Sequence, residues 1–548
     1  MSHSRRRFLT YLGMGTYAAL ACPSRAAAAA PAAFPLPRPR GAAPLFRPIA
    51  PSTEDKLLLA DGFRYDTVCT WGDPLGTRGL HGPETFGFNN DFLAYFPIDA
   101  LQGGKNSNEG LLWVNHEYPN PLFVSGYDGM STKTEAQIVA EKLSVGGSVL
   151  HVRRDASGGV WRHVPGSKHT RRFTALYPTM EVTGAASARV PRATGTLANC
   201  SGGRTPWSTV LSCEENFHDY NRGNGVSTGT GYRWSDVPDQ AIQEREYGWI
   251  VEVDPFGDLP PLKHSALGRF AHENAAWRLA PSGKLVVYMG DDAQDQFLYK
   301  FVSAEKYKAD APRAEKRKLL TAGTLYAADF GAGRWLPLDI ARSPALRAAG
   351  FADQADVLLR TRDASRALKA TPLDRPEDCE VHPLDGTLYV ALTNNTAHGN
   401  YYGQIVRLLE DKDDAGGESF RFEIFLAGGP QSGLACPDNL AFDRKGNLWV
   451  VCDISGKSIN KGAYRPFGNN GMFLVPTNGP SAGEAFQFAS GPVQSELTGP
   501  WFTEDEKTLF LAVQHPGEES KSRAALTSHW PRGGEDVPRP AVVAITGF

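Results

Sequence analysis

The sequence contains no apolar run that approaches the roughly 20 residues of a membrane-spanning helix. It also has no excess of basic residues, since 57 Lys and Arg stand against 60 Asp and Glu and give a formal charge of −3. A protein that binds nucleic acid needs clustered positive charge against the phosphate backbone. We therefore expect no nucleic-acid partner, no stable membrane anchor, and a small-molecule substrate or ligand.

Cysteine is scarce as well. Seven cysteines in 548 residues are too few for a scaffold held together by disulfides. Six of them, from Cys69 to Cys452, lie beyond the N-terminal segment. Their even number permits bridges, but at least one could instead be a thiolate ligand of a metal ion.

The N-terminal segment has the pattern of a twin-arginine signal peptide. Arg5, Arg6 and Arg7 precede a mildly apolar stretch and an Ala-rich run, which predicts a signal over residues 1–33. The twin-arginine translocation machinery would then export the folded chain to the periplasm or the medium. Residues 34–60 are rich in Pro, Ala and Arg and are predicted to be a tether. Residues 61–548 are predicted to form a single, monomeric domain.

Turn-forming residues are abundant, with 57 Gly and 39 Pro, and this excludes an all-α fold. Short apolar strands are expected within six segments, most of which follow a turn. These segments are 111–114, 208–211, 284–287, 387–390, 447–450 and 508–511. Because they are apolar on both faces, we interpret them as inner strands buried between neighbouring sheets.

Six such strands favour an all-β fold, a six-bladed β-propeller with helical and loop insertions. Residues 304–370, which are rich in Ala and Arg, are interpreted as an insertion, and residues 541–545 as a terminal strand that completes a blade. A pair of β-sandwich domains is the alternative fold that this pattern leaves open.

Reactive side chains stand 10 to 12 residues before four of the strands: Cys200, Glu273, Glu377 and Asp438. If the repeats are related by rotation about one axis, equivalent positions converge on that axis. A second set of carboxylates directly follows the strands. We expect it at the same end of the ring as the first set. Its members are Glu117, Glu214 and Glu215, and Asp291 and Asp292.

So many carboxylates at one mouth would repel one another strongly unless cations were bound there. Carboxylate oxygens suit calcium, and a thiolate adds a ligand for a softer transition metal. Arg375 stands two residues before Glu377. Its planar guanidinium is suited to hold a tetrahedral oxyanion through two parallel hydrogen bonds, which points to phosphoryl chemistry.

Eight ordered motifs between Asn89 and the C-terminus resemble the PhoX family of exported alkaline phosphatases. They are Asn89-Asn90-Asp91-Phe92, Trp113-Val114-Asn115-His116-Glu117, Asn199-Cys200-Ser201-Gly202-Gly203 with Thr205-Pro206-Trp207, Cys213-Glu214-Glu215-Asn216, His272-Glu273-Asn274, Gly290-Asp291-Asp292, Arg375-Pro376-Glu377-Asp378, and Trp530-Pro531 with Pro538-Arg539-Pro540.

This resemblance implies a six-bladed propeller with a mixed cluster of iron (Fe3+) and calcium (Ca2+) that hydrolyses phosphate monoesters, and some diesters, outside the cytoplasm. Cys200 resembles the iron thiolate ligand, and Arg375 resembles the phosphate clamp. The remaining metal ligands implied by the resemblance are Glu117, Glu214, Glu273, Asp292, Glu377 and Asp438. Asp438 is assigned more from its spacing before the strand than from a motif. Asp291 could be the metal ligand in place of Asp292.

Two other functions remain open at this point. One is a calcium-dependent lactonase or esterase on a similar propeller. The other is a binding propeller without catalytic activity, in which calcium only stiffens the fold.

Overall fold

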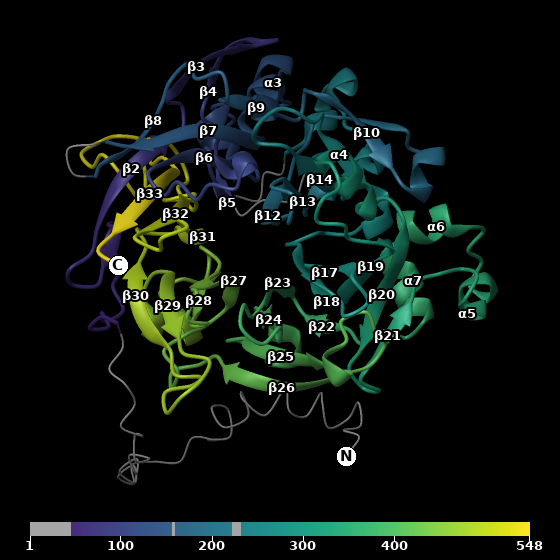
Figure 1. Cartoon of the computed structure of the whole chain (residues 1–548). Coiled ribbons are helices and arrows are strands. Elements are labelled where there is room, and N and C mark those ends of the chain that lie inside the picture. The colour runs from purple at the N-terminus through teal and green to yellow at the C-terminus, as the bar shows by residue number, and fades with distance from the viewer. Residues whose placement is uncertain (1–44, 156–158, 222–231) are drawn as a thin grey trace.

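The computed structural model describes residues 45–155, 159–221 and 232–548. The predicted signal peptide at 1–33 lies outside the described residues. Within them, six larger sheets follow one another around a common centre (Figure 1). Almost all neighbouring strands are antiparallel, and the pair β10 and β15 is parallel. The expectation of a mainly β protein is confirmed.

The first three sheets contain the following strands in hydrogen-bonded order. The first consists of β5 (Asn90–Pro97), β6 (Glu109–His116), β7 (Gly146–Arg154) and β8 (Trp161–His163), with β9 (Arg171–Phe173) also on β7. The second consists of β12 (Asn199–Arg204), β13 (Val210–Glu214), β14 (Ile250–Val253), β15 (Leu262–His264), β10 (Thr179–Thr183) and β11 (Arg192–Thr194). The third consists of β16 (Ala276–Leu279), β17 (Lys284–Gly290), β19 (Leu298–Lys306), β20 (Gly323–Asp329) and β21 (Arg334–Pro337).

The other three sheets follow in the same way. The fourth consists of β23 (Pro376–Val381), β24 (Leu388–Leu392), β25 (Gln404–Glu410) and β26 (Phe420–Ala427). The fifth consists of β27 (Pro437–Phe442), β28 (Leu448–Cys452), β29 (Gly471–Val475), β30 (Phe486–Ser490) and β1 (Leu58–Leu59). The sixth consists of β31 (Glu496–Phe502), β32 (Thr508–Gln514), β33 (Ala541–Thr546) and β2 (Arg64–Thr70). Two small pairs are β3 (Pro74–Gly79) with β4 (Gly82–Thr85), and β18 (Gln294–Gln296) with β22 (Leu373–Asp374).

The six predicted strand segments overlap β6, β13, β17, β24, β28 and β32, so a strand is present at each, although β13 begins only at Val210. They are the second strands of their sheets, however, rather than the innermost ones. The innermost strands are β5, β12, β16, β23, β27 and β31 (Figure 1). The second strands have the stronger apolar pattern because both of their faces lie against neighbouring sheets.

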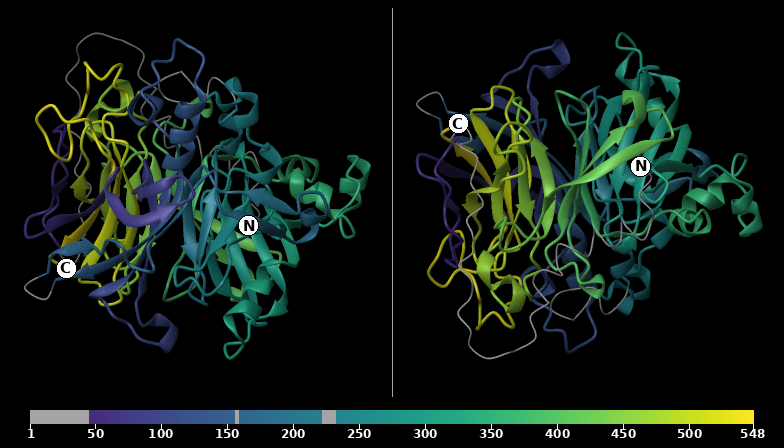
Figure 2. Two further views of the ribbon diagram at one scale, coloured as in Figure 1. Left: turned by 90° about the horizontal axis from the view of Figure 1, so that it is seen from above. Right: turned by 90° about the horizontal axis from the view of Figure 1, so that it is seen from below.

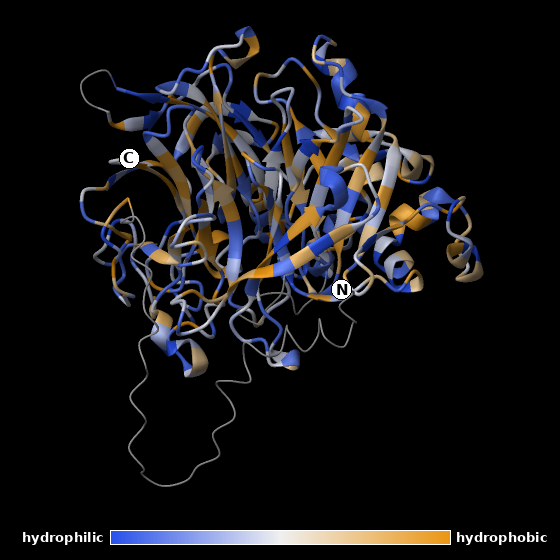
Figure 3. Ribbon diagram, turned by 60° about the horizontal axis from the view of Figure 1, so that its bottom comes forward, coloured by the Kyte–Doolittle hydropathy of each residue, from blue (hydrophilic) through white to orange (hydrophobic). Residues whose placement is uncertain are grey.

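Alternation along the second strands builds the core. On β17, Leu285 and Val287 pack against the second sheet, whereas Val286 and Tyr288 pack against the fourth. Similar hydrophobic clusters join every sheet to the next one, and the sixth sheet to the first. Apolar residues accordingly lie mostly along the strands in Figure 3, and polar residues mostly in the loops at their ends. Burial between sheets is therefore the main force that holds the ring together.

Polar side chains on the innermost strands, or just before them, also link one sheet to the next. Asn274 Nδ2 donates to the carbonyl of Cys379 at 2.6 Å, and Asp378 Oδ2 accepts from the N–H of Leu440 at 2.8 Å. Asn439 Oδ1 accepts from the N–H of Gly499 at 2.8 Å. Because these bonds satisfy buried polar groups, they fix the spacing of the innermost strands around the centre.

The two ends of the chain meet in the sixth sheet. Strand β33 pairs with β32 on one side and with β2 on the other. The expected terminal strand at 541–545 is therefore confirmed. The predicted tether behaves differently, because β1 pairs with β30 and Phe46 is buried beside Trp449 and Phe488. Its residues from 45 onward belong to the packed domain.

The helices are short and lie outside the sheets. They are α2 (Pro121–Val124), α3 (Glu135–Ser144), α4 (Arg313–Lys316), α5 (Pro344–Ala348), α6 (Gln354–Leu359) and α7 (Thr361–Ala367). Helices α5 and α6 project from the outer edge of the ring (Figures 1 and 2). The predicted insertion at 304–370 contains them, but it also contains β20 and β21, which complete the third sheet. Across the described residues, none of the helices has the length and apolarity needed to cross a membrane.

Candidate metal centre

A pocket of about 310 Å³ opens where the innermost strands begin. Its lining, taken over the described residues, combines nine carboxylates with one thiol, Arg375 and His515. The acidic residues are Asp91, Glu117, Glu215, Asp292, Glu377, Asp438, Asp453, Glu496 and Glu518. Glu273 lies behind this lining and is completely buried. The pocket is therefore one of strong negative charge.

A repeated backbone conformation directs these side chains. In five of the six sheets, a non-glycine residue with positive φ stands two positions before the pocket residue of the innermost strand. These residues are Asn89, Ala198, Arg375, Cys436 and Gln494, with φ between 53° and 56°. They precede Asp91, Cys200, Glu377, Asp438 and Glu496. Non-glycine residues adopt this left-handed conformation rarely and at some cost, and such positions concentrate at functional sites.

The same residues connect the two sets of pocket side chains. The carbonyl of Asn89 accepts from the N–H of Glu117, and the carbonyl of Ala198 accepts from the N–H of Glu215. Cys436 accepts in the same way from Asp453. Each of these donors is the first residue after the second strand of its sheet. The repeat thus brings one residue from the start of the innermost strand beside one from the end of the second strand.

Irregular pairing follows directly after these positions. The ladder shifts register between Asn90 and Leu93, between Asn199 and Gly202, and between Pro376 and Cys379. The same shift occurs between Pro437 and Leu440. A β-bulge re-aims the side chain of the strand that carries it. The bulges therefore turn Asp91, Cys200, Glu377 and Asp438 toward the centre.

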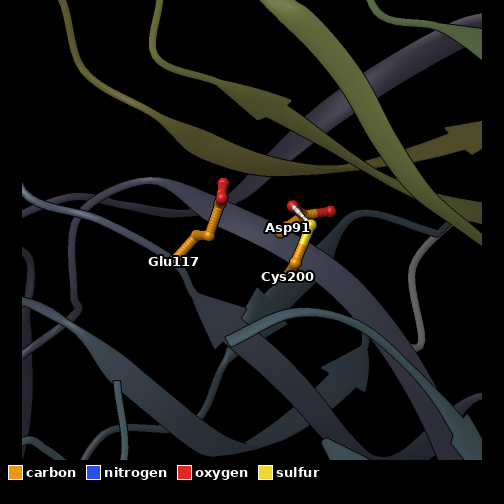
Figure 4. A group of neighbouring side chains, drawn as sticks. All are labelled: Asp91, Glu117 and Cys200. Carbon is orange, nitrogen blue, oxygen red and sulfur yellow. Dashed lines mark hydrogen bonds between the residues drawn. The ribbon is translucent and has the colours of Figure 1, made fainter. Parts of the chain in front are cut away.

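The ligand atoms form three groups, and within each group they all lie within 4.8 Å of one another. The groups are Asp91, Glu117 and Cys200; Cys200, Glu215 and Glu273; and Glu273, Glu377 and Asp438. Figure 4 shows the first group, with the Asp91 carboxylate directly beside the Cys200 thiol and Glu117 to one side of both. The Cys200 sulfur is 3.3 Å from Asp91 Oδ2 and 3.3 Å from Glu273 Oε1. Since Cys200 and Glu273 are each shared by two groups, the three groups form one continuous cluster.

Burial and mutual repulsion disfavour the charged forms of these residues. Burial, followed by the charges of Glu377 and Glu215, raises the pKa of Glu273 well above its usual range. Burial raises the pKa of Asp91 to about 7. Burial and the carboxylates of Asp91 and Glu273 also raise the pKa of the Cys200 thiol. A bound cation would reverse each of these effects by favouring the deprotonated form.

Several buried carboxylate oxygens have no hydrogen-bond partner within the described residues. Three of them belong to residues of the cluster and its pocket: Asp91 Oδ1, Glu273 Oε2 and Asp292 Oδ1. An unsatisfied buried oxygen costs free energy, so such atoms are rare unless an ion or water completes them. The donor set, which combines carboxylate oxygens with one thiolate sulfur, fits a mixture of hard and softer metal ions. The residues present therefore fit a metal cluster.

Arg375 lies on the wall of this pocket and is held by three carboxylates. Its Nη2 is 2.7 Å from Asp292 Oδ2 and 2.7 Å from Glu377 Oε1, and its Nη1 is 3.0 Å from Asp453 Oδ2. Burial acts to lower the pKa of Arg375, but these three carboxylates outweigh it and raise the pKa well above its ordinary value. The guanidinium is therefore charged and fixed in place.

His515 supplies the second positive charge of the pocket. Its ring stacks on Tyr118, and its Nε2 is 3.2 Å from Glu496 Oε1. Burial acts to lower the pKa of His515, but Glu518 and Glu496 raise it to about 10.

A model of the family described as Alkaline phosphatase PhoX matches residues 44–517. The chain belongs to this family. It is therefore a metal-dependent phosphatase that hydrolyses phosphate esters. The resemblance to the PhoX family that was inferred from the sequence is thereby confirmed.

Solved structures agree with this assignment. The chain is 32% identical to PhoX of Pseudomonas fluorescens, a structure in complex with vanadate, a transition-state analogue. The TM-score is 0.80, and the match covers 91% of this chain and 97% of that one. A gluconolactonase from Xanthomonas campestris is 11% identical, with a TM-score of 0.31 over 91% of this chain and 98% of that one, which is too remote to indicate function. A comparison with curated proteins found no match.

Most of the residues predicted from the sequence of this PhoX-family chain lie together. Glu117, Cys200, Asp292, Glu377 and Asp438 line the pocket with Arg375, and Glu273 lies directly behind it. The alternative at Asp291 is not in the pocket, because that carboxylate forms an ion pair with Arg362.

Glu214 is the exception. Its carboxylate is 2.6 Å from the Lys263 ammonium and accepts from Thr196 Oγ1 at 2.8 Å, in a fully buried position away from the pocket. Glu215 reaches the pocket instead. Glu214 is the last residue of β13, and successive side chains point to opposite sides of an extended chain. The placement of a pocket carboxylate at Glu214 was therefore wrong by one residue.

The structure adds pocket residues that the sequence interpretation did not assign: Asp91, Asp453, Glu496 and His515. Asp91 was present in a quoted motif but received no role. Glu496 precedes Leu509 by 13 residues, close to the spacing of the other four, so a slightly wider spacing rule would have found it.

Proposed function

We propose that this pocket binds a mixed cluster of iron and calcium and hydrolyses phosphate monoesters, with some diesters, outside the cytoplasm. The observation that carries the proposal is the continuous cluster in which Cys200 and Glu273 are shared among three groups of ligand atoms. A single thiolate surrounded by carboxylates supports one softer metal among harder ones.

The ligand groups divide naturally between the metals. Cys200, with Glu215 and Glu273, would hold iron. Glu377 and Asp438, together with Asp91 and Glu117 at the other end of the cluster, offer oxygen atoms that suit calcium. When bound, these cations would neutralise the charge that develops on the phosphoryl oxygens.

Arg375 would orient the substrate. Three carboxylates fix its guanidinium at the wall of the pocket. A planar guanidinium can donate two parallel hydrogen bonds to a phosphoryl group, and its fixed position means that little reorganisation accompanies binding. We expect Arg375 to contact the phosphate more strongly as charge moves onto the oxygens.

The fold and the cellular setting complete the proposal. The ring of six mutually packed sheets, closed by β33 between β32 and β2, supports a six-bladed β-propeller. The pattern around Arg5, Arg6 and Arg7 supports a twin-arginine signal at 1–33 and export to the periplasm or the medium. We propose that residues beyond this signal act as one monomeric domain.

The test is metal analysis of the exported protein beside an assay with 4-nitrophenyl phosphate. We expect iron and calcium together, and we expect Cys200→Ser to lower both the iron content and the activity. Cys452→Ser is the control, because Cys452 is a buried free cysteine that does not line the pocket. Fully active protein that contains calcium alone, or Cys200→Ser protein with normal iron and activity, would contradict the mixed cluster.

A further inference from the structure

A second hollow of about 650 Å³ lies beside the metal pocket. The two are joined along the chain, because Ser455 and Gly456 line the pocket whereas Lys457 and Ser458 line the hollow. The other wall is connected to Arg375, whose carbonyl accepts from the N–H of Thr393, the residue before Asn394. The hollow therefore lies beside the backbone segments of Arg375 and Ser455, two residues that line the pocket.

The charge of the hollow is opposite to that of the pocket. Its lining contains Lys457 and Lys461 and no acidic residue. Both lysines are exposed, and neither has a carboxylate partner within 4.0 Å among the described residues. Lys461 Nζ donates to the carbonyl of Lys457 at 2.9 Å, which holds the two residues close together. Two unpaired ammonium groups at the rim of an acidic pocket form a local attraction for anions.

The floor of the hollow is ordered by aromatic residues. Tyr464 is buried and its hydroxyl donates to the carbonyl of Tyr401 at 2.7 Å. Tyr464 also packs edge-on against Tyr402. The segment that presents Lys461 therefore rests on a fixed base.

We propose that this hollow is a subsite for leaving groups that carry a second phosphate. This inference rests on the proposed phosphatase function. With one phosphoryl group at Arg375, the leaving group of the ester would extend over the hollow, because the hollow adjoins the pocket at residues 455–458. A second phosphate there would meet Lys457 and Lys461, whereas an uncharged leaving group would gain nothing from them. The preferred substrates are then small bisphosphorylated compounds rather than simple monoesters.

The experiment compares fructose 1,6-bisphosphate with fructose 6-phosphate, using metal-loaded protein and expressing the preference as a ratio of kcat/KM values. We expect the wild type to prefer the bisphosphate by about tenfold, the scale of two exposed charge contacts. The double variant Lys457→Gln with Lys461→Gln should bring this ratio close to one, mainly by raising KM for the bisphosphate. High salt should lower the wild-type preference in the same direction.

The control is Lys445→Gln with Lys507→Gln. These two lysines are also exposed, and they lie in the turns at the opposite ends of the strands that begin at the pocket. This pair removes the same charge and should keep the wild-type ratio. A wild type without preference, or an equal loss of preference in both double variants, overturns the inference. Absence of hydrolysis of 4-nitrophenyl phosphate in the metal-loaded wild type would instead overturn the proposed function.

Discussion

Buried carboxylates within the sheets differ from those in the pocket. Within the sheets, three buried glutamates each have a cation of their own: Glu214 lies 2.6 Å from Lys263, Glu252 lies 3.0 Å from Arg317, and Glu410 lies 3.1 Å from Lys300. In the pocket, nine carboxylates of the described chain face Arg375 and His515. Paired acids hold sheets together, whereas acids in such excess need charge from outside the chain.

Adjacent residues show the same difference most sharply. Glu214 ends β13 and meets Lys263, and Glu215 begins the following loop and meets the cluster. The residue type is identical, so position in the fold alone decides between a structural ion pair and a metal ligand.

Removing the metals should have the largest effect. We expect a chelator to lower phosphatase activity by on the order of 10³-fold or more, because the stabilisation of the transition state by several kcal/mol is lost. The melting temperature should fall as well, since ligands that bind only the folded state stabilise it. Addition of iron with calcium should restore both properties. Full activity in protein shown to be free of metal would remove the distinction between the two sets of acids.

Exchange of the adjacent glutamates should separate their roles. Glu214→Gln should lower the free energy of unfolding by about 3 to 5 kcal/mol, because it leaves Lys263 buried without its partner. The metal content of the folded fraction should stay near that of the wild type. Glu215→Gln should lower the metal content and activity with a smaller loss of stability. Denaturant titration and metal analysis of both variants measure these effects. If Glu214→Gln lost metal and Glu215→Gln did not, Glu214 would be the metal ligand.

Substitution of Arg375 should have the next largest effect. Arg375→Ala should lower kcat/KM by roughly 10²-fold, about 3 kcal/mol, the scale of one charged contact in the transition state. Arg375→Lys should not restore it, because a point charge cannot donate two parallel hydrogen bonds. Metal content is the control. If metal is lost while the remaining loaded protein is fully active, Arg375 serves only to neutralise Asp292 and Glu377.

The last effect concerns Glu252, a carboxylate paired within the sheets, and it appears only at low pH. Burial acts to raise the pKa of Glu252, but hydrogen bonds and charges from His264 and Arg317 lower it from 4.5 to about 2. A lowered folded-state pKa contributes stability above pH 4.5 that is lost as the pH falls toward 2. We expect a loss of about 3 kcal/mol over this range in unfolding titrations. Glu252→Gln should flatten this part of the pH profile, and an unchanged profile would contradict the pairing.

Much of this architecture could be predicted from the sequence. The second strands are apolar on both faces, so β6, β17 and β28 stood out clearly. The innermost strands carry polar residues such as Asp378 and Asn439, which bond to the next sheet, and these strands were therefore not recognised. Strands β20 and β21 were hidden because they lie in a segment rich in Ala and Arg with several helices.

The pocket was predictable where spacing was regular. Cys200, Glu273, Glu377 and Asp438 stand 10 to 12 residues before their second strands. Asp91 stands 21 residues before Leu112, because the loop between β5 and β6 is longer, and so it escaped the rule. Spacing along the chain also could not separate Glu214 from Glu215, since that choice depends on the residue at which β13 ends.

The pairing of β2 with β33 places a limit on the order of folding events. These strands come from opposite ends of the domain, so their contact is among the last that a growing chain can make. The pocket takes Asp91 from the first sheet and Glu496 from the sixth, which lie side by side because β5 packs against β31. The complete set of ligands therefore exists only in the assembled ring, and not in any single sheet.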